Sequence, residues 1–427
     1  MAKGFRTFLL CLLAFAVAVG AFCILYPLTI GRPADDDTAS PAVPDQSEPA
    51  QQPQDDGTDG TGGYNPDDNA TSPLTQWQTM AQADVLNMTL EEKVYQLFLV
   101  TPEGLTGVGT ATVAGDTTRE ALAVKPVGGL VYFAQNLVDR EQAMDLLSGT
   151  QSFSEIPLLL AVDEEGGTVS RVGANPAMGT TDFSDMADYG DAGDTAAVYQ
   201  VGQTLARELT ELGFNLDFAP VADVVTNPNN TEIGRRSFSS DPQVAASMVG
   251  SIVSGLRDGG ILCSLKHFPG HGGTETDTHD GRSVTNRTLE EMRQAEFLPF
   301  QAGIEAGAPM VMVGHLSAPQ LTGDDTPADL SYTVVTEILR RELGFAGVVV
   351  TDAQNMGAIT DYYTPGEAAV AALNAGVDLV LMPADLEQAV QGVLAALADG
   401  SLSQERIDES VTRVLAMKYE YGLITPQ

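Results

Sequence analysis

The feature that most constrains the fold is an eightfold alternation of short apolar runs with longer helical patterns, which starts near residue 74. The runs are typical of buried parallel strands, and each precedes a segment with helical periodicity. Eight such units over roughly 350 residues predict a single-domain (β/α)8 barrel. An open doubly wound sheet remains the alternative, because strand order cannot be read from one sequence. The expected strands are Tyr95–Val100, Gly129–Phe133, Pro157–Val162, Asn215–Ala219, Ile261–Lys266, Met310–Gly314, Gly347–Thr351 and Asp378–Met382.

The helices between these strands have clear start and stop signals. A Thr followed three residues later by Glu predicts a capping box, in which the two side chains satisfy backbone N–H groups of the first turn. One apolar stripe ends at Gly213, and another helix is expected to run from Asp241-Pro242 to Gly259-Gly260. The capping boxes begin at Thr89, Thr288 and Thr364, and the stripe consists of Val198, Val201, Leu205, Leu209 and Leu212.

The N-terminal residues have the composition of a membrane segment. Residues 8–30 include no charged side chain, and a helix of this length spans the ~30 Å hydrocarbon core of a bilayer. Lys3 and Arg6 precede the run, which predicts that residues 1–7 are cytoplasmic. Because the run exceeds the roughly 7–15 residues of a signal-peptide core, we expect an uncleaved single-pass anchor in the cell membrane. Cleavage after Ala21 is the alternative, and either reading places the rest of the chain outside the cytoplasm.

The next segment, residues 31–73, is an acidic linker rich in Pro, Gly, Ser and Asp. It has too little apolar surface to offset the entropy cost of ordering, so we expect it to be disordered. Residues 74–427 then form the folded domain. The formal net charge of −37, from 58 acidic and 21 basic residues, argues against a nucleic-acid partner. Of the three cysteines only Cys263 lies outside the apolar N-terminal run, so no disulfide framework is expected.

Unusual polar residues gather where the expected strands end. In a (β/α)8 barrel the carboxyl ends of all strands meet at one face, which is where active sites form. Structural roles explain some of them: Asp385 fits a helix cap, Gly166-Gly167 serves the backbone, and Asp217 and Asp223 are left open between structure and chemistry. Caps do not require His, Lys and Arg beside them. The residues that follow strands include all four histidines, namely His267, His271, His279 and His315, together with Asp163, Glu164, Glu165, Arg171, Arg236, Lys266, Asp277 and Asp352.

Metal and serine chemistry fit this pattern poorly. His267 and His271 are four residues apart, as in a zinc-protease helix, but Pro269-Gly270 between them breaks such a helix. We therefore expect no metal and no cofactor. Ser237 and Ser264 lack the turn of a nucleophile elbow.

Carboxylate chemistry with a histidine proton donor fits better. Cleavage of a glycosidic bond with retention requires a carboxylate nucleophile and a separate acid. Asp352 ends a fully apolar strand and is therefore rigidly placed. Asp277 precedes His279 by two residues and can orient its imidazole.

The segment Lys266-His267-Phe268-Pro269-Gly270-His271-Gly272, followed by Asp277-Thr278-His279, resembles glycoside hydrolase family 3. More narrowly, it is similar to the bacterial β-N-acetylglucosaminidases of that family, whose acid is an Asp-x-His pair. The similarity extends from about Leu74 to Leu423. Further segments match in order: Asp163-Glu164-Glu165-Gly166-Gly167 with Arg171, Asn215–Val224, Arg236-Ser237-Phe238 and Thr351-Asp352.

The resemblance implies a role for each site residue. Asp352 would be the nucleophile that forms a covalent glycosyl-enzyme intermediate. His279 would act as general acid and then base, supported by Asp277. The terminal sugar would be hydrogen-bonded by Asp163, Arg171, Arg236, Lys266 and His267.

The resemblance also implies a retaining, exo-acting β-N-acetylhexosaminidase that removes terminal β-linked N-acetylglucosamine from peptidoglycan fragments or other glycans, in cell-wall turnover or glycan scavenging. A monomer is expected. A β-glucosidase or β-xylosidase of the same family, a phosphorolytic variant and a non-catalytic glycan-binding protein are the alternatives. The loop Gly273-Thr274-Glu275-Thr276 and the residues Ala353-Gln354-Asn355 depart from the commoner family pattern, which puts substrate detail in doubt more than reaction type.

Overall fold

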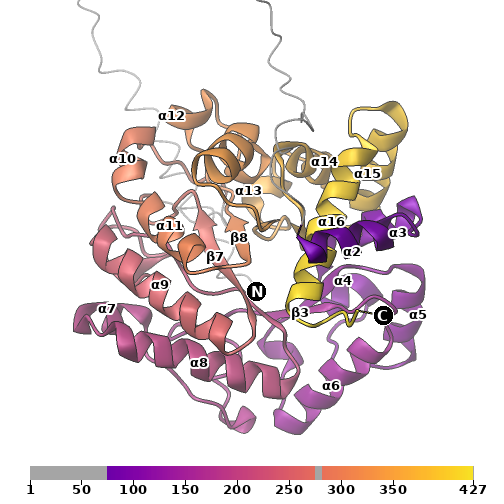
Figure 1. Cartoon of the computed structure of the whole chain (residues 1–427), viewed down its shortest axis with the longest axis horizontal. Coiled ribbons are helices and arrows are strands. Elements are labelled where there is room, and N and C mark those ends of the chain that lie inside the picture. The colour runs from indigo at the N-terminus through magenta and orange to yellow at the C-terminus, as the bar shows by residue number, and fades with distance from the viewer. Residues whose placement is uncertain (1–74, 275–280, 427) are drawn as a thin grey trace, which may run out of the picture. The chain divides into compact units, whose positions relative to one another are not determined.

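The computed structural model describes residues 75–274 and 281–426, and its strands form a parallel, nearly closed barrel surrounded by helices (Figure 1). All eight strands expected from the sequence are present, each shorter than or shifted by a few residues from its expected range. The strands are β1 (Phe98–Val100), β2 (Gly129–Tyr132), β3 (Leu159–Val162), β6 (Leu216–Asp217), β7 (Leu262–Phe268), β8 (Met310–Val313), β9 (Val348–Thr351) and β10 (Val380–Leu381).

The order of pairing decides between a barrel and an open sheet. Neighbouring strands follow the order β10-β1-β2-β3-β6-β7-β8-β9, and every pair in this series is parallel. The two ends of the series also meet, because Val350 bridges Leu379 and the Thr351 N–H donates to the Leu379 carbonyl at 3.0 Å. The barrel prediction is therefore confirmed, and the doubly wound alternative is wrong.

The helices follow the capping signals closely. Each predicted capping box is formed, Asp241 caps one helix, and Gly213 ends another with a φ of 108°. All five residues of the predicted stripe are buried. The α-helices are α2 (Gln76–Val85), α3 (Leu90–Tyr95), α4 (Pro102–Thr106), α5 (Asp116–Val124), α6 (Arg140–Ser152), α7 (Met186–Ala192), α8 (Thr195–Leu212), α9 (Pro242–Asp258), α10 (Leu289–Gln294), α11 (Phe297–Glu305), α12 (Pro319–Thr322), α13 (Gly357–Thr360), α14 (Pro365–Ala375), α15 (Leu386–Asp399) and α16 (Gln404–Glu420). The 3-10 helices are η2 (Ala134–Asn136), η3 (Pro176–Met178), η4 (Gly234–Arg236) and η5 (Ala328–Leu330), and η6 (Thr333–Glu342) is a π-helix.

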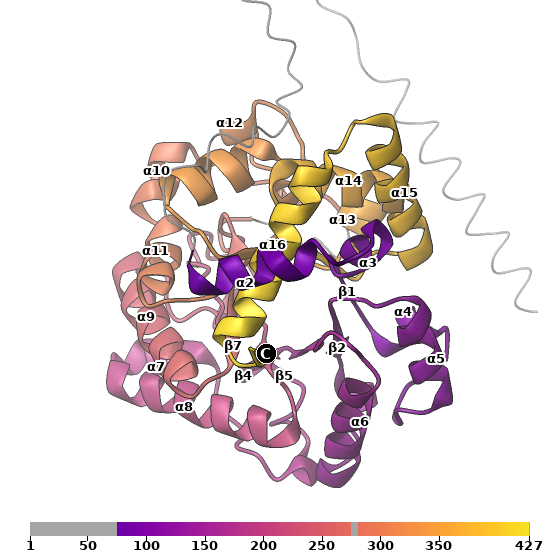
Figure 2. The same ribbon diagram turned by 45° about the vertical axis from the view of Figure 1, so that its right-hand side comes forward.

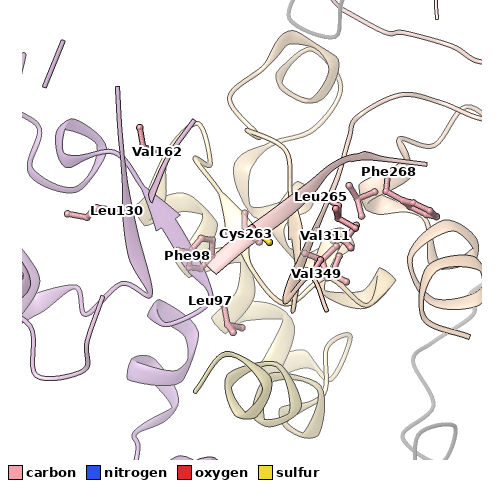
Figure 3. Packing of buried hydrophobic residues seen from close by; sticks show 14 of the residues in the cluster. Leu97, Phe98, Leu130, Val162, Cys263, Leu265, Phe268, Val311 and Val349 are labelled. Carbon is pink, nitrogen blue, oxygen red and sulfur yellow. The ribbon is translucent and has the colours of Figure 1, made fainter. Parts of the chain in front are cut away.

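Alternation along the strands separates two apolar cores. Outward-facing side chains pack against the helices, and in Figure 3 Leu265, Val311 and Val349 lie together on neighbouring strands, in the pairing register of β7, β8 and β9. Inward-facing side chains form a separate cluster inside the barrel. Its strand members are Leu99, Val131, Leu159, Ala161, Leu216, Leu262, Met310, Met312, Val348, Val350, Leu379 and Leu381.

The last helix closes the end of the barrel opposite the carboxyl ends of the strands. Val414 and Met417 of α16 belong to the interior cluster, and Tyr421 and Leu423 pack against it. The α2 helix crosses α16 (Figure 2), and the Trp77 ring stacks on Tyr419 with centroids 6.4 Å apart. The first and last helices of this domain therefore stabilise each other. The sequence did not predict this plug.

A small hairpin after β3 was also not predicted. It pairs β4 (Glu164–Gly166) with β5 (Val169–Ser170) in antiparallel orientation. Gly166 and Gly167 have φ values of 84° and 59°, a conformation that other residue types rarely adopt, so these glycines do serve the backbone. The hairpin brings Glu165 and Arg171 back over the end of the barrel.

The predicted membrane anchor, residues 8–30, and the linker, residues 31–73, lie outside the described residues. Within residues 75–274 and 281–426, no helix has the length and apolar character required to cross a bilayer. Both assignments therefore stay predictions.

The close contact between α8 and α9 gives a test of the fold. A Cβ atom added at Gly255 of α9 would lie 2.3 Å from the Tyr199 carbonyl oxygen of α8, so Gly255→Ala must push the helices apart. We expect it to lower the free energy of unfolding by about 1–3 kcal/mol, as overpacking does. Urea unfolding followed by circular dichroism measures the change.

Gly250 on the same helix is the matched control. Its added Cβ would meet nothing nearer than 3.6 Å, so Gly250→Ala should raise stability by about 0.5–1 kcal/mol, the helix propensity difference alone. Equal effects of the two substitutions would contradict the helix packing described.

Candidate active site

On three strands, the series of inward-facing residues ends in a charged side chain at the carboxyl end of the barrel. Asp163 follows the inward pair Leu159 and Ala161 of β3, and Asp352 follows Val348 and Val350 of β9. Lys266 lies on β7, four residues after the inward-facing Leu262. Since side chains on one face of a strand recur every second residue, the barrel aims all three at its carboxyl-end mouth.

These residues line one cavity of about 360 Å³. Every predicted site residue within the described part of the chain borders it. The register of β7 shifts between Leu265 and Phe268, so that both Lys266 and its neighbour His267 reach the cavity. The charged and polar lining consists of Asp163, Glu165, Arg171, Glu232, Arg236, Lys266, His267, His271, Asp352 and Asn355.

A buried chain of ion pairs forms one wall of the cavity. The Lys266 ammonium lies 2.6 Å from a carboxylate oxygen of Asp163 and 2.6 Å from one of Glu165. Glu165 also accepts two hydrogen bonds from Arg236, at 2.8 and 2.9 Å, and Arg236 pairs with Glu232 at 3.1 Å. Burial alone would raise the pKa of Glu165, but Lys266 and Arg236 lower it to about 2. The network therefore stays charged at physiological pH.

The two cavity histidines are held by one carboxylate. Asp223 accepts from His267 Nδ1 at 2.8 Å, from the His267 N–H at 3.1 Å and from the His271 N–H at 2.6 Å. Because Asp223 is a carboxylate that accepts, the hydrogen belongs on Nδ1 of His267, and Nε2 remains for a ligand. Burial and the neighbouring His267 lower the pKa of His271. The role of Asp223 could not be decided from the sequence, and in the structure it positions His267.

Asp352 is fixed at the end of β9. Its backbone N–H donates to the Val313 carbonyl at 2.9 Å, and its Oδ1 accepts from the Ala353 N–H at 2.8 Å. Burial would raise the pKa of its carboxyl group, but His267, His315 and Lys266 together lower it below the ordinary value. The Asp352 carboxyl group is therefore held in its ionised form, the form in which a carboxylate can attack.

Arg171 faces the same cavity from the segment that follows β5. Its guanidinium lies 5.7 Å from the centroid of the Phe133 ring. Its Nε is buried and, among the residues that the structure describes, has no hydrogen-bond partner. A donor in this state costs free energy unless a ligand satisfies it, so Arg171 suits a substrate-binding role.

The remaining predicted residues divide into two groups. Asp277 and His279 lie outside the described residues, so their roles stay predictions. Asp385 accepts from the Gln388 N–H as the cap of α15, and Asp217 is buried and accepts from the Glu164 N–H at 3.0 Å, so both are structural. Within the described ranges no group of three or more His, Cys, Asp or Glu side chains is arranged to hold a metal ion.

No role was predicted from the sequence for Glu165, for Glu232 or for the buried pair His315–Asp329. Glu165 stands in the recognised Asp-Glu-Glu-Gly-Gly segment, which was the available signal. His315 was placed after a strand but given no role. Nothing local marks Asp329, because its significance depends on a contact with His315 across 14 residues.

Comparison with known proteins decides the family. The model of the glycosyl hydrolase family 3 N-terminal domain matches residues 89–417. The chain belongs to glycoside hydrolase family 3. The family 3 match includes all eight barrel strands and every cavity residue named above.

The chain is also similar to proteins named beta-hexosaminidases. Beta-hexosaminidase A of Pseudoalteromonas piscicida is 34% identical over 375 residues, which is 82% of this chain and 62% of that protein. Beta-hexosaminidase LpqI of Mycobacterium tuberculosis is 38% identical over 62% of this chain and 68% of its own length. This chain thus spans less than two thirds of the first of these relatives.

Solved structures agree on the barrel. A family 3 β-N-acetylglucosaminidase from Paenibacillus sp. superposes with a TM-score of 0.74 and 36% identity, over 80% of this chain and 64% of that one. A beta-glucoside phosphorylase, BglX, superposes with a TM-score of 0.73 and 25% identity over 83% of this chain and 64% of that one.

The ion-pair wall predicts a pH-dependent stability. Glu165→Gln removes the carboxylate shared by Lys266 and Arg236, and should lower the free energy of unfolding at pH 7 by about 3 kcal/mol. The folded-state pKa of Glu165, about 2, lies below its ordinary 4.5, so its contribution is complete above pH 4.5 and is lost as the pH falls toward 2. Urea unfolding at pH 7 and pH 3 should show a difference that narrows at pH 3.

Asp163→Asn is the matched control. It removes a partner of the same Lys266 at the same 2.6 Å, but the Asp163 side chain is 19% exposed against 1% for Glu165. Asp163→Asn should therefore destabilise less. A difference between wild type and Glu165→Gln that does not change with pH would contradict the assignment.

Proposed function

We propose that this chain is a retaining, exo-acting β-N-acetylhexosaminidase that releases terminal β-linked N-acetylglucosamine through a covalent glycosyl-enzyme intermediate. The observation that carries the proposal is Asp352: a half-buried carboxylate of lowered pKa at the end of β9, in the cavity that the ion-pair wall borders. Family membership supports the reaction class. The names of the relatives support the acetamido sugar.

The wall supports recognition of a single neutral sugar. Asp163 and Lys266 offer an acceptor and a donor side by side, and Arg171 and Arg236 add donors. Charged groups form stronger hydrogen bonds to hydroxyls than neutral ones do. Phe133, Met312 and Met382 add apolar lining against which the faces of a pyranose can pack.

The proposed reaction has two steps. Asp352 attacks the anomeric carbon while His279, oriented by Asp277, donates a proton to the departing glycosidic oxygen. Water then attacks the intermediate, and His279 accepts its proton, so that the β configuration is retained. A carboxylate of lowered pKa suits the first step because it attacks as the anion.

The alternatives within the family differ in substrate and acceptor. A β-glucosidase or β-xylosidase would prefer sugars without the acetamido group, and a phosphorylase, like the BglX structures, would require phosphate. Turnover of 4-nitrophenyl N-acetyl-β-glucosaminide, β-glucoside and β-xyloside, each with and without phosphate, separates them. No turnover of any of these would favour a glycan-binding protein. The apolar segment 8–30 supports an extracytoplasmic, membrane-anchored reaction site, which cell fractionation tests.

Asp352→Asn tests the nucleophile. The change preserves size and removes the attacking charge, so the variant should fold, bind sugar and lose at least about 10³-fold in kcat, near 4 kcal/mol of barrier. A 5-fluoro glycosyl fluoride of N-acetylglucosamine should label the wild-type peptide that includes Asp352, as mass spectrometry of the digest would show. Labelling of Asp163, or a first product of inverted configuration by NMR, would refute the assignment.

His279→Ala tests the acid. Turnover should fall strongly for poor leaving groups, which require protonation, and much less for the glycosylation step of an activated aryl glycoside. Asp277→Ala should have the same dependence in a milder form, because it removes the orienting group and leaves the proton carrier. Pre-steady-state rates for a series of aryl leaving groups measure this. A small loss that is equal for all leaving groups would exclude His279 as the acid.

A further inference from the structure

The turn that follows Asp352 is held at three consecutive residues. The Asp352 N–H donates to the Val313 carbonyl at 2.9 Å, and the Gln354 N–H donates to the Leu381 carbonyl at 2.9 Å. Between them, the Ala353 carbonyl oxygen lies 3.0 Å from Nε2 of His315. Two of these contacts are ordinary barrel hydrogen bonds. The third depends on a buried side chain that no step of the proposed reaction uses.

His315 has acceptors at both of its ring nitrogens. Nε2 faces the Ala353 carbonyl, which can only accept, so Nε2 must donate. Nδ1 lies 3.1 Å from Oδ1 of Asp329, and although these two atoms are not aligned as a hydrogen bond, the buried carboxylate at ion-pairing distance favours a proton on Nδ1. An imidazole with a proton on both nitrogens is a cation. Burial would lower the pKa of His315, but Asp329 and the nearby Asp352 raise it to about 9, in agreement with this geometry.

Asp329 is itself fixed in place. The side chains of His315 and Asp329 are both fully buried. The Asp329 N–H donates to the Gly314 carbonyl at 3.3 Å, and the Ala328 N–H donates to the Leu316 carbonyl at 2.9 Å, so η5 is tied to both sides of His315. Gln354 reaches the other carboxylate oxygen of Asp329 at 3.5 Å. The pair therefore touches the turn at Ala353 and at Gln354.

The position of the pair separates it from the sugar-binding residues. Asp352 and Ala353 line the cavity, and His315 and Asp329 lie behind them. The other charged or titratable groups that face Asp352, namely Lys266, His267 and His271, border the cavity themselves, so their fields change when substrate binds. His315 is fully buried behind the cavity, so neither solvent nor a bound sugar screens its charge.

We propose that His315 and Asp329 are a buried positioning pair, which holds the Asp352–Gln354 turn and provides a permanent positive charge behind the Asp352 carboxylate. This inference rests on the proposed function, because it assumes that Asp352 must be ionised to attack. His315 acts through Asp352 and touches no substrate, so it is a positioning residue.

His315→Gln separates the charge from the hydrogen bond. Glutamine can still donate to the Ala353 carbonyl but is neutral. With the cation gone and Asp329 unpaired, Asp352 should gain a proton more readily. The acid limb is the part of the pH profile in which kcat/KM falls as the pH is lowered. Measured with 4-nitrophenyl N-acetyl-β-glucosaminide, this limb should move to higher pH by about one unit or more. The plateau above this limb should stay within about tenfold of wild type.

The double variant His315→Gln/Asp329→Asn protects the test against misfolding. It replaces the ion pair with two amides, so no unpaired buried charge remains. The acid limb of its kcat/KM profile should lie at a higher pH than that of wild type, because the cation is missing. It should lie at a lower pH than that of His315→Gln, because the Asp329 carboxylate, which repels the negative charge of Asp352, is also gone. This order distinguishes charge from packing.

Ser317→Ala is the matched control on the same segment. Ser317 is fully buried and donates to the Asp325 carbonyl at 2.7 Å, and its loss removes a hydrogen bond without changing any charge. It should lower the melting temperature and leave the acid limb where it is in wild type. A purely structural role for His315 would make all three variants resemble this control.

Labelling keeps this inference separate from the proposed function. Each variant is treated with the fluoro-sugar inactivator described above. If Asp352 is labelled and the acid limb does not move in the folded variants, the positioning pair is refuted and the nucleophile stands. If another carboxylate is labelled, the proposed nucleophile fails, whatever the pH profiles show.

Discussion

The two-residue repeat of strands within a closed barrel is the constraint on which the rest of this molecule depends. It directs Leu159, Ala161 and then Asp163 to the same side, and it does the same for Val348, Val350 and Asp352. The apolar residues of each series fill the interior, and the next residue of the series reaches the mouth. A one-residue slip would place the carboxylates among the helices, where they would be buried without partners. The core and the active site are therefore specified by the same pattern.

Burial at the mouth makes pairing of charge obligatory. Glu165 is inaccessible to solvent and shares its two oxygens between Lys266 and Arg236, and Asp223 is inaccessible and accepts three hydrogen bonds from His267 and His271. Each of these carboxylates has a pKa below its ordinary value despite burial. Glu165 and Asp223 are thus fixed in place by the residues with which they pair. Asp352 forms no direct ion pair in the described residues, so that its carboxylate is not matched by a cation of its own.

What the sequence predicted well was local. Strand positions, capping boxes and the stripe of α8 depend on neighbours within a few residues, and all were confirmed. The residues lining the cavity were predictable because a barrel gathers its strand ends, whatever their separation in the chain. Contacts between residues far apart in the chain were not predictable. Glu165 pairs with Arg236 across 71 residues, and the packing of Tyr421 and Leu423 against the interior cluster depends on where the last helix lies. The roles of Asp277 and His279, which lie outside the described residues, rest on their spacing and on the resemblance.

The cavity is rich in basic side chains, although the chain as a whole is strongly acidic. The molecule is strongly acidic, with 58 acidic and 21 basic residues, yet its cavity gathers Arg171, Arg236, Lys266 and two histidines. A cation-rich pocket could be taken as a device to attract anions. Here most of the positive charge is already matched, by Glu165, Asp163 and Asp223, at hydrogen-bonding distances. Lys266 also helps to lower the pKa of Asp352, so the positive charge of the wall acts on the chain's own carboxylate as well as on a ligand. In the proposed reaction, a neutral sugar would meet fixed dipoles rather than a net field, and such a preorganised site would stabilise the charge that develops at the anomeric carbon.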